Sequence, residues 1–595
     1  MSNFNDPQER KVSNVVARIL ALNGVETVFG ISGGASLHLL HGIRINPNLR
    51  LVANHHEQAS AMAADAMSRF TGNIGVAIAT SGPGATNLVT GIAGCYFDSI
   101  PTLFITGQVS STRMRGKSGV RQIGFQETDI VNIVKPITKY AVQVKDENEV
   151  VTELEKCIFL AKTGRGGPTL IDIPDDIQRR FINSDIEIPI SAVNIKANHY
   201  PNLDDNSIKI LKTLVINAQK PVVVIGWGVH LSQRELEVLD FVNKLGWPVV
   251  LTWGASDFMP SDHSLRGGTF GTHGTRSANY IIQNSDLVLS IGSRLDTKAT
   301  GSPPSCFAPN AKIIMLDIDP SEIGKFSLLD RQIDLGIQVD FKSDYFIVLL
   351  KTILEYSKPA STEWEKRYGE YRQVLGQEPK QILEVGVNPY SFIDELSKLA
   401  PNNSRIILDT GCAVAWTSQK WNVKDNQRVY HDYNNTAMGW SLPAALASTL
   451  IADGKETLVL VGDGSFMMNI QELSVISESK NPVKIFILNN YGYSMIKQTQ
   501  DQWFDSSYFA SDGGSELPFP NFQKIAEAFG FGYSAIVNES NFVTKMESVI
   551  DSKKSEICEV IISEKARVIP QVKFGSPIQV MEPPIDPDRE RLLFN

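Results

Sequence analysis

The sequence predicts an α/β protein built from three doubly wound parallel-sheet domains. Its 595 residues are enough for three or four domains. Short, apolar, β-branched runs such as residues 75–79 and 221–225 are typical of strands buried in a parallel sheet. These runs alternate with helical segments in three successive blocks, and such alternation indicates a mostly parallel sheet that helices cover on both faces.

The composition narrows the class of function. Hydrophobic residues make up 42% of the chain and charged residues 20%, as in ordinary globular proteins. The net charge of −9 argues against general binding to nucleic acid or to membrane surfaces. Five scattered cysteines without a CxxC pair fit a reducing cytoplasm, and neither a signal-peptide core nor a membrane-spanning run is evident. We therefore expect a cytoplasmic protein that acts on small molecules.

The first predicted domain covers residues 1–185. A helix over residues 12–23 leads into a strand over 26–30 and a glycine turn at Gly33 and Gly34. A second strand, 51–54, ends at the sequence His-His-Glu, and a helix rich in small residues follows over 58–70. The buried strand 75–79 then leads into the turn 81–87 (SGPGATN).

Two further domains and a tail follow. A polar linker over 186–200 precedes a second domain over 200–365, whose predicted strands are 221–225, 247–252, 287–292 and 313–317. A charged linker over 356–385 leads to the third domain, 386–565. The last residues, 566–595, are rich in proline, and we expect them to lie over a surface or to reach another subunit.

The most informative stretch is 459–493, which is predicted to form a strand, a Gly-Asp-Gly turn, one helix, a second strand and an Asn-Asn pair. Asp463 and Asn490 thereby reach neighbouring strand ends, where open α/β sheets bind ligands. Two hard oxygen ligands at that place suit a Mg²⁺ ion that holds a diphosphate. A lone Gly-Asp-Gly turn would favour an ordinary βαβ unit with polar turns.

The spacing of this stretch resembles the signature of the thiamine-diphosphate (ThDP) enzymes, with 24 residues between Gly464 and Asn489. The resemblance implies that Asp463, Asn490 and the carbonyl of Gly492 bind the metal. It also implies that Glu57, about 400 residues earlier, activates the aminopyrimidine of the cofactor. In that family the glutamate serves the cofactor bound by a partner subunit, so at least a homodimer, or a tetramer, is implied. Without the resemblance, Glu57 would be an ordinary acid at a helix start.

Within these enzymes the chain is most similar to the acetohydroxyacid (acetolactate) synthases, over nearly its whole length. The similarity is carried by segments 81–87, 105–109, 124–128 and 167–174. It implies a pyrimidine-binding first domain, an FAD-binding central domain and a third domain that binds the diphosphate and Mg²⁺. The residues that it assigns to catalysis are Gly34, Glu57, Phe125, Gln126, Lys139 and Lys298. Those that it assigns to ThDP are Ala35, Pro83, Asn87, Gln108, Thr436, Met438, Gly462, Gly464 and Ser465.

The middle domain resembles the flavin domain of these synthases, in which FAD takes no net part in the reaction. We therefore expect a structural FAD. The residues that the resemblance assigns to it are Arg165, Gly226, Gly228, Thr252, Gly271, His273, Gly274, Gly292, Arg294, Asp296, Asp317, Ile318 and Asp340.

Departures from the synthase pattern gather on the acceptor side. Lys298 stands where the family has an arginine that binds the carboxylate of the second 2-ketoacid, and lysine lacks the bidentate fork. Thr499 replaces the tryptophan that selects the acceptor, and Thr272 replaces a methionine of the pocket. Near the diphosphate, Cys412 and Ala413 replace a Gln-His pair.

These departures and the tail resemble ketosugar carboligases of the YerE type, from surface-polysaccharide pathways. We therefore predict transfer of a two-carbon unit from pyruvate to a nucleotide-linked ketosugar. Three alternatives stay open: an acetolactate synthase, a flavin-coupled pyruvate oxidase and a non-catalytic binding module. Intact Glu57, Asp463 and Asn490 argue against the last of these.

Overall fold

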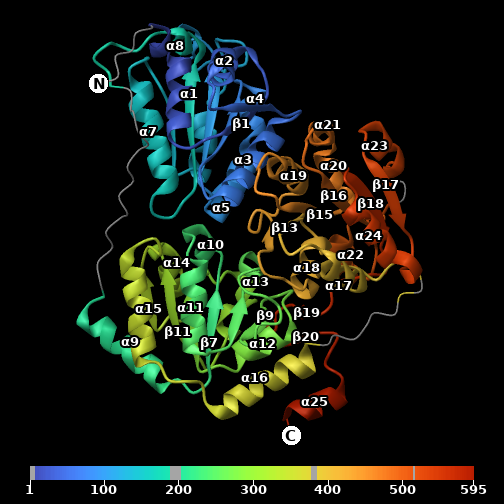
Figure 1. Ribbon diagram of the computed structural model, residues 1–595. Coiled ribbons are helices and arrows are strands. Elements are labelled where there is room, and N and C mark those ends of the chain that lie inside the picture. Colours follow the sequence, from blue (N-terminus) through green and yellow to red (C-terminus); the bar gives the residue numbers. More distant parts are fainter. Residues whose placement is uncertain (1–6, 188–202, 377–382, 384, 514–515, 595) are drawn as a thin grey trace. The chain divides into compact units, whose positions relative to one another are not determined.

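The computed structural model describes residues 7–187, 203–376, 383, 385–513 and 516–594 (Figure 1). The described residues contain three six-stranded sheets and a two-stranded ribbon, with helices between the strands. This arrangement confirms the predicted α/β class. The chain divides into two compact units. The first comprises Met1–Lys196, Asp432–Asp453 and Ser465–Val483, and the second comprises Ala197–His431, Gly454–Gly464 and Lys484–Asn595.

The N-terminal sheet has the strand order β2-β1-β3-β4-β6-β5. Its strands are β1 Thr27–Gly30, β2 Arg50–Ala53, β3 Gly75–Ala79, β4 Thr102–Gln108, β5 Tyr140–Gln143 and β6 Pro168–Pro174. Helices α1 Val12–Leu22 and α7 Glu149–Lys162 lie beside this sheet (Figure 1). Both supply buried side chains to its core. The chain runs from β1 outward to β2 and then returns to β3, so the switch point of the sheet lies between β1 and β3. Parallel sheets bind ligands at such a point, beyond the carboxyl ends of the strands.

Small residues let the helices of the first unit pack closely. Helix α3, Glu57–Thr71, lies against α5, Val89–Asp98, and α19, Ser441–Thr449. A Cβ added at Gly91 would lie 2.4 Å from the Cβ of Ala61, so α5 can approach α3 only with glycine there. The alanine-rich sequence predicted as a helix over 58–70 therefore forms a helix–helix contact surface.

The central sheet has the order β12-β11-β10-β7-β8-β9. Its strands are β7 Pro221–Ile225, β8 Val249–Leu251, β9 Arg266–Thr269, β10 Leu287–Ile291, β11 Lys312–Asp317 and β12 Leu335–Gln338. Counted from β7, this is the order 3-2-1-4-5-6 of dinucleotide-binding folds, with the switch point between β7 and β10. Helices α11 Glu235–Leu245, α12 Arg276–Gln283 and α15 Asp344–Tyr356 contribute to its core.

Two segments belong to the central core that the sequence did not assign to it. The predicted charged linker contains helix α16, Thr362–Leu375, whose Trp364 is buried and donates a hydrogen bond to the Pro221 carbonyl at 2.9 Å. A linker was therefore the wrong prediction for these residues. The tail forms the strands β19 Gln571–Val572 and β20 Met581–Glu582 and helix α25 Pro587–Phe594, and its Ile578 and Leu593 are buried in the same core. The other predicted linker lies largely outside the described residues.

The third sheet, β14-β13-β15-β16-β18-β17, repeats the strand order of the first. Its strands are β13 Ser404–Leu408, β14 Arg428–Tyr430, β15 Glu456–Gly462, β16 Val483–Asn489, β17 Gly532–Ile536 and β18 Glu556–Ile561. Between β15 and β16 the chain forms α20 Asp463–Met468, η8 Ile470–Glu472 and α21 Leu473–Ser477, not the single predicted helix. Asn469 leaves the helical conformation with φ −131°, and its amide donates to the Gly439 carbonyl at 2.8 Å. No helix within the described ranges is long and apolar enough to cross a membrane.

Candidate active site

Asp463 and Asn490 lie at the carboxyl ends of the neighbouring strands β15 and β16. The Asp463 carboxylate accepts hydrogen bonds from the backbone N–H groups of Gly464 at 2.7 Å and Gly492 at 3.0 Å. Burial raises the pKa of Asp463 to about 6, although backbone N–H donors and the Lys497 charge partly offset its desolvation. The amide oxygen of Asn490 is buried and has no hydrogen-bond partner among the described residues. Such an oxygen is costly to bury alone. A Mg²⁺ ion shared with Asp463 would satisfy it, so these residues fit the implied metal.

The turn after β16 is shaped to present this metal site. Asn489 accepts from the Tyr491 N–H at 3.0 Å and donates to Glu559 at 2.6 Å. Gly492 has φ 150°, and a Cβ there would lie 2.3 Å from the Ser511 carbonyl oxygen. Only glycine fits that position. No atom lies within 4 Å of where a Cβ would stand on Gly462, which leaves room beside Asp463.

On its other side β15 pairs with β13, and the chain after β13 carries Cys412 and Ala413. Cys412 and Ala413 begin helix α18, Cys412–Lys420, and both are buried in the core. Burial raises the pKa of the Cys412 thiol to about 12, so it stays protonated. In the part of the chain that the structure describes, no cluster of three His, Cys, Asp or Glu side chains could hold a metal. A metal here would therefore depend on one carboxylate, an amide, a carbonyl and ligands from outside the protein.

Glu57 is the first residue of α3 and is held from two sides. Its Oε2 accepts a hydrogen bond from the Asn87 amide at 2.9 Å, and a Cβ at Gly84 would lie 3.1 Å from its Oε1. The turn before it is fixed by Glu472, which accepts from the Asn54 amide and the His55 N–H, both at 2.9 Å. Sequence reasoning missed Glu472 and assigned Asn87 to the cofactor, whereas here Asn87 orients the predicted activating acid.

Several predicted donor-side residues share this edge of the N-terminal sheet with Glu57. The Ala35 N–H donates to Thr80 at 3.2 Å, and no atom lies within 4 Å of a Cβ on Gly34. Gln126, with φ 64°, approaches Gly82 so closely that a Cβ there would lie 2.9 Å from its own. The turn that contains Pro83 and the segment 124–126 therefore meet, and the neighbouring Phe125 ring is 87% exposed.

Gln108 lies at the same edge but is already bonded. It ends β4, and its amide donates to the Thr128 carbonyl at 2.7 Å and to Asp172 at 3.1 Å. Its own oxygen accepts from the Val109 N–H at 3.0 Å. These contacts fix the loop that leads to Phe125.

Lys139 and Arg165 lie at the opposite end of this sheet, near the amino ends of strands β5 and β6. Lys139 precedes β5, and its N–H bonds to Pro168, the first residue of β6, whereas Gln108 pairs with Pro174, the last. Its ammonium donates to the Leu160 and Thr163 carbonyls at the end of α7, and burial lowers the pKa of Lys139 to about 8. Arg165 donates to Ser99 at 2.8 Å. The structure therefore does not bring these two residues together with Glu57.

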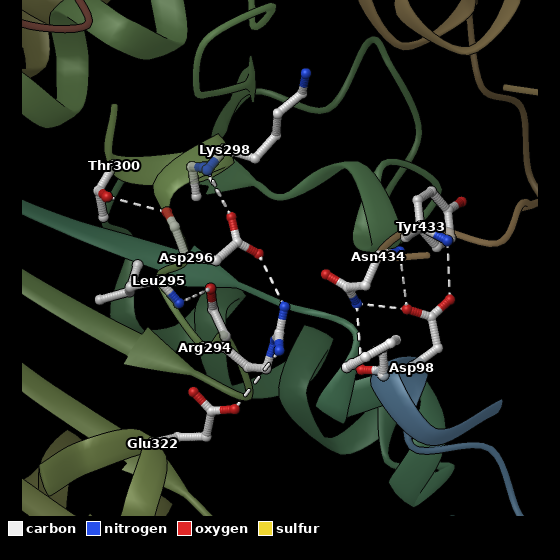
Figure 2. A network of polar contacts seen from close by, with 12 residues as sticks. Asp98, Arg294, Leu295, Asp296, Lys298, Thr300, Glu322, Tyr433 and Asn434 are labelled. Atoms are coloured by element: carbon white, nitrogen blue, oxygen red, sulfur yellow. Dashed lines mark hydrogen bonds and ion pairs between the residues drawn. The ribbon is translucent and has the colours of Figure 1, made fainter. Parts of the chain in front are cut away.

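The segment 432–440, which carries Thr436 and Met438, is anchored by buried charges. Asp98 accepts from the backbone N–H groups of Tyr433 at 2.8 Å and Asn434 at 3.1 Å (Figure 2). The Trp440 indole donates to Asp65 at 2.6 Å. The sequence analysis missed this anchor.

One guanidinium, that of Arg69, forms ion pairs with the buried carboxylates of this anchor. Arg69 pairs with Asp65 at 3.0 Å and with Asp98 at 2.8 Å, and all three side chains are buried. Asp432 adds a third buried carboxylate, and burial together with Asp98 raises the pKa of Asp432 to about 8. The i, i+4 spacing of Asp65 and Arg69 on the helix that Glu57 begins is the signal that could have revealed the cluster.

The residues predicted to bind FAD follow the strands of the central sheet. Gly226 and Gly228 follow β7, and Gly292 follows β10 across the switch point. A Cβ at Gly226 would lie 2.3 Å from the Gly292 carbonyl oxygen, and one at Gly228 would lie 2.9 Å from its Cα. Close backbone packing therefore explains these glycines without a ligand.

Charged groups line the same edge. Arg294 pairs with Asp296 at 3.3 Å and with Glu322 at 3.6 Å (Figure 2). Asp317 ends β11 next to Ile318, and Asp340 follows β12 and accepts from the Lys342 N–H at 2.9 Å. Thr252 follows β8, and its N–H bonds to the Ile225 carbonyl at 3.0 Å. Cations for a diphosphate and carboxylates for ribose hydroxyl groups are thus both present, a donor set that fits a dinucleotide.

Two of the acceptor-side departures contact each other. The Thr272 N–H donates to the Lys298 carbonyl at 2.9 Å, and the Thr272 carbonyl accepts from Val572 of the tail at 2.8 Å. The Lys298 side chain extends away from Asp296 (Figure 2), and its ammonium lies 5.1 Å from the centre of the Trp253 ring. Desolvation lowers the pKa of Lys298, and burial with the Lys298 charge lowers the pKa of His273 to about 3. The site thus holds a neutral imidazole beside a cation.

Thr499 lies on another element, helix α22, Ser494–Trp503. It is exposed, and its hydroxyl donates to the Met495 carbonyl at 3.1 Å. One turn later, the Trp503 ring packs at 5.4 Å against Phe574 of the tail. The tail therefore contacts both α22 and the Thr272 loop.

Three family profiles match the chain. They are described as the N-terminal TPP binding domain (residues 10–133), the central domain (208–345) and the C-terminal TPP binding domain (409–560) of thiamine pyrophosphate enzymes. Among curated proteins, "Acetolactate synthase 1, chloroplastic" of Nicotiana tabacum is 32% identical over 585 residues, which is 97% of this chain and 85% of the relative. "Acetolactate synthase large subunit" of Lactococcus lactis is 30% identical over 568 residues, or 95% and 94% of the two chains.

These matches agree with the geometry at both ends of the chain. The N-terminal profile covers Glu57, and the C-terminal profile covers Asp463 and Asn490, which follow the neighbouring strands β15 and β16. The chain therefore belongs to the thiamine-diphosphate-dependent acetolactate synthase family and is an acetolactate synthase-like enzyme.

Proposed function

We propose that this enzyme decarboxylates pyruvate, joins the remaining two-carbon unit to a ketone, and uses a small 2-ketoacid as acceptor, as an acetolactate synthase does. The acetolactate synthases among its relatives support this acceptor over the ketosugar that the departures suggest. The observation that carries the proposal is the unpartnered Asn490 oxygen beside the Asp463 carboxylate at the end of β15 and β16.

Different residues of the chain would bind the metal and hold the proton. Asp463, Asn490 and the Gly492 carbonyl would hold Mg²⁺ and through it the cofactor diphosphate. Glu57 would hold a proton at N1′ of the aminopyrimidine with Oε1, while Asn87 keeps Oε2 in place. Thiamine diphosphate, when bound, supplies the nucleophilic carbon and accepts the electron pair of the decarboxylation.

The overall reaction balances without an external oxidant. The C1–C2 bond of pyruvate breaks and CO₂ leaves. C2 then bonds to the ketone carbon of the acceptor, and the acceptor oxygen takes up a proton. Lys298, an exposed lysine whose ammonium lies 5.1 Å from the centre of the Trp253 ring, would bind the acceptor carboxylate.

The test is to incubate the purified protein with pyruvate, thiamine diphosphate and Mg²⁺, and to assay acetoin by its colour reaction after acid treatment. Glu57→Gln should abolish the product while cofactor binding persists, because Glu57 acts on the bound cofactor. Unchanged turnover in that variant would refute the assignment. Oxygen uptake that matches CO₂ release would instead identify a pyruvate oxidase.

A second candidate acceptor is a nucleotide-linked ketosugar. It is favoured by the contact between Lys298 and Thr272, which puts two departures from the synthase pattern in one place. Mass spectrometry of products from pyruvate with a panel of 2-ketoacids, ketones and nucleotide ketosugars separates the candidates. Abundant acetolactate with no ketosugar product excludes this one.

Two further expectations belong to the same proposal. A structural FAD is supported by the strand order of the central sheet and by the charged groups at its switch point. A homodimer or tetramer with shared sites is supported by the exposed ring of Phe125, which a partner would cover. Absorbance near the flavin bands and sedimentation velocity test these two expectations independently.

A further inference from the structure

Lys497 is a buried cation directly behind the proposed metal turn. It lies on α22 with an exposed fraction of only 2%. Its ammonium donates to the Asp512 carboxylate at 2.6 Å and lies 3.5 Å from the Tyr491 carbonyl oxygen. An ammonium group is rarely buried unless it is paired, so the ion pair with Asp512 accounts for the burial of Lys497 and fixes the position of both residues.

The partner of Lys497 belongs to a segment that lines the back of the metal turn. Gly492 and Asp512 form an antiparallel bridge, and the Tyr493 N–H donates to the Ser511 carbonyl at 2.8 Å. A Cβ at Gly513 would lie 2.4 Å from the Tyr491 carbonyl oxygen. Residues 511–513 are therefore in close contact with residues 491–493.

Gly492 itself lies between this segment and Lys497. A Cβ on Gly492 would lie 2.3 Å from the Ser511 oxygen and 3.1 Å from the Lys497 Nζ. The ammonium thus touches the residue whose carbonyl is the proposed metal ligand. Any shift of Lys497 or of Ser511 changes the space available to that peptide.

A second side chain of α22 holds the same segment. Gln500 is buried, accepts a hydrogen bond from the Ser511 hydroxyl, and donates to the Phe509 carbonyl at 2.9 Å. Lys497 and Gln500 are three residues apart and lie on one face of the helix. Together they fix the segment 509–512 to α22, which begins two residues after Gly492.

We infer that Lys497 is a positioning residue of the metal–diphosphate site: through its ion pair with Asp512 it pins the segment 511–513 behind Gly492. The inference rests on the proposed metal site. Because the Lys497 ammonium is paired with the Asp512 carboxylate at 2.6 Å, its effect on the metal site comes from holding the turn in place. Residues that orient metal ligands in this way typically contribute about tenfold to 100-fold to metal affinity.

The test compares Lys497→Met with Lys484→Met. Lys484 lies near the start of β16, the strand that leads into the metal turn; it is as buried as Lys497 and donates to the Ser552 and Lys554 carbonyls at 2.6 Å. Both variants bury a methionine in place of a bonded lysine in one domain, but only Lys497 lies at the metal turn. The Mg²⁺ dissociation constant is measured by calorimetry with thiamine diphosphate in excess, beside kcat at saturating cofactor.

Lys497→Met should weaken Mg²⁺ binding by about tenfold to 100-fold. It should also reduce the hydrogen-exchange protection of residues 491–493. At saturating cofactor, kcat should stay within about threefold of the parent, since no reacting atom is touched. Lys484→Met should bind Mg²⁺ as the parent does. Equal affinity in Lys497→Met, or an equal loss in both variants, would overturn the inference.

Two further variants keep the result interpretable. Asp463→Asn tests the metal site itself. If Asp463→Asn binds Mg²⁺ as the parent does, the proposed metal site is wrong. If Asp463→Asn loses Mg²⁺ binding and Lys497→Met does not, only the proposed role of Lys497 is wrong. Should Lys497→Met fail to fold, Asp512→Asn removes the same ion pair from the partner side, whose side chain is 53% exposed. Unchanged Mg²⁺ affinity in Asp512→Asn would then count against the inference.

Discussion

Asn87 holds the carboxylate on which the proposed chemistry depends. Its amide bonds to Glu57 Oε2 at 2.9 Å. We expect Asn87→Ala to lower kcat by about tenfold to 100-fold, because positioned proton transfer contributes at least that much and the carboxylate would lose its orientation. The dissociation constant of thiamine diphosphate should change far less than kcat. Steady-state kinetics with a cofactor titration checks this, and a loss confined to cofactor affinity would show that Asn87 binds the cofactor instead.

Arg69 is the guanidinium that neutralises the buried acids beneath segment 432–440. We expect Arg69→Met to lower the free energy of unfolding by roughly 3–5 kcal/mol, because Asp65 and Asp98 would be left buried without a cation. Asp432→Asn is the matched control: since the pKa of Asp432 is raised to about 8, the variant replaces a mostly protonated carboxyl of the same cluster at neutral pH and should change stability little. Urea unfolding of both variants provides the measurement. A small effect of Arg69→Met would mean that water reaches the cluster.

Helix α10, Gly228–Ser232, is bonded to strand β14 through His230. Its imidazole contacts Glu235 and Asp257, each at 2.9 Å, and Arg428 pairs with the same two carboxylates. Burial and the Arg428 charge lower the pKa of His230, but the two carboxylates outweigh both, so the net pKa is raised. Both ring nitrogens therefore donate, and the imidazolium ties the two elements together.

This imidazolium gives the protein a pH dependence of defined sign. Because the pKa of His230 is raised on folding, its stabilisation is complete below the unfolded value of about 6.5 and is lost as the pH rises through the folded value. We expect the urea midpoint to fall as the pH rises above about 6.5, and more steeply in the parent than in His230→Gln. Identical slopes in both proteins would exclude His230 as the cause.

The C-terminal ribbon is held by one fully buried side chain, Ile578. Its main-chain oxygen accepts from the Asn279 amide at 2.8 Å, and its side chain packs where a Cβ on Gly301 would stand at 2.7 Å. Ile578→Ala should cost about 2–5 kcal/mol of unfolding free energy, as for other buried isoleucines. Val580→Ala, two residues away and 43% exposed, should cost within about 0.5 kcal/mol. Comparable losses would place the ribbon outside the core.

At the scale of the molecule, cofactor binding should couple to unfolding. A ligand that binds only the folded state adds about 2.7 kcal/mol at 100 times its dissociation constant. We expect thiamine diphosphate with Mg²⁺ to raise the melting temperature of the parent. Asp463→Asn should lose that increase, because it lacks the carboxylate that would hold the metal. Differential scanning calorimetry with and without cofactor checks both outcomes.

Much of the fold could be read from periodicity. The apolar strand 75–79 was predicted with its observed bounds, and the helix from Glu57 was placed within one residue at each end. Helix α16 was missed because its sequence is rich in charge and buries only Trp364, Tyr371 and Leu375. A narrow buried stripe of this kind has no strong periodic signal, and burial comes from tertiary contacts instead.

Some residues of the candidate site could also be predicted from the sequence, and others could not. Asp463 and Asn490 lie at strand ends, where parallel topology brings them together, so their pairing was predictable from spacing. Lys139 could not be placed from spacing, because its side chain turns to the carbonyl end of α7 at the far edge of the sheet. Lys497 and Glu472 were invisible to the sequence, since their partners are remote along the chain or in irregular loops.

The burial of Ile578 and Leu593 also bears on how the chain is made. Domains usually fold in order as they leave the ribosome. The central sheet is complete in the nascent chain once β12 has emerged, but Ile578 and Leu593 of its core emerge only after the last strand of the third sheet. Until then that core is open to chaperones and proteases. A chain truncated before Ile578 would therefore lack core side chains of the central sheet while still containing every strand of the other two six-stranded sheets.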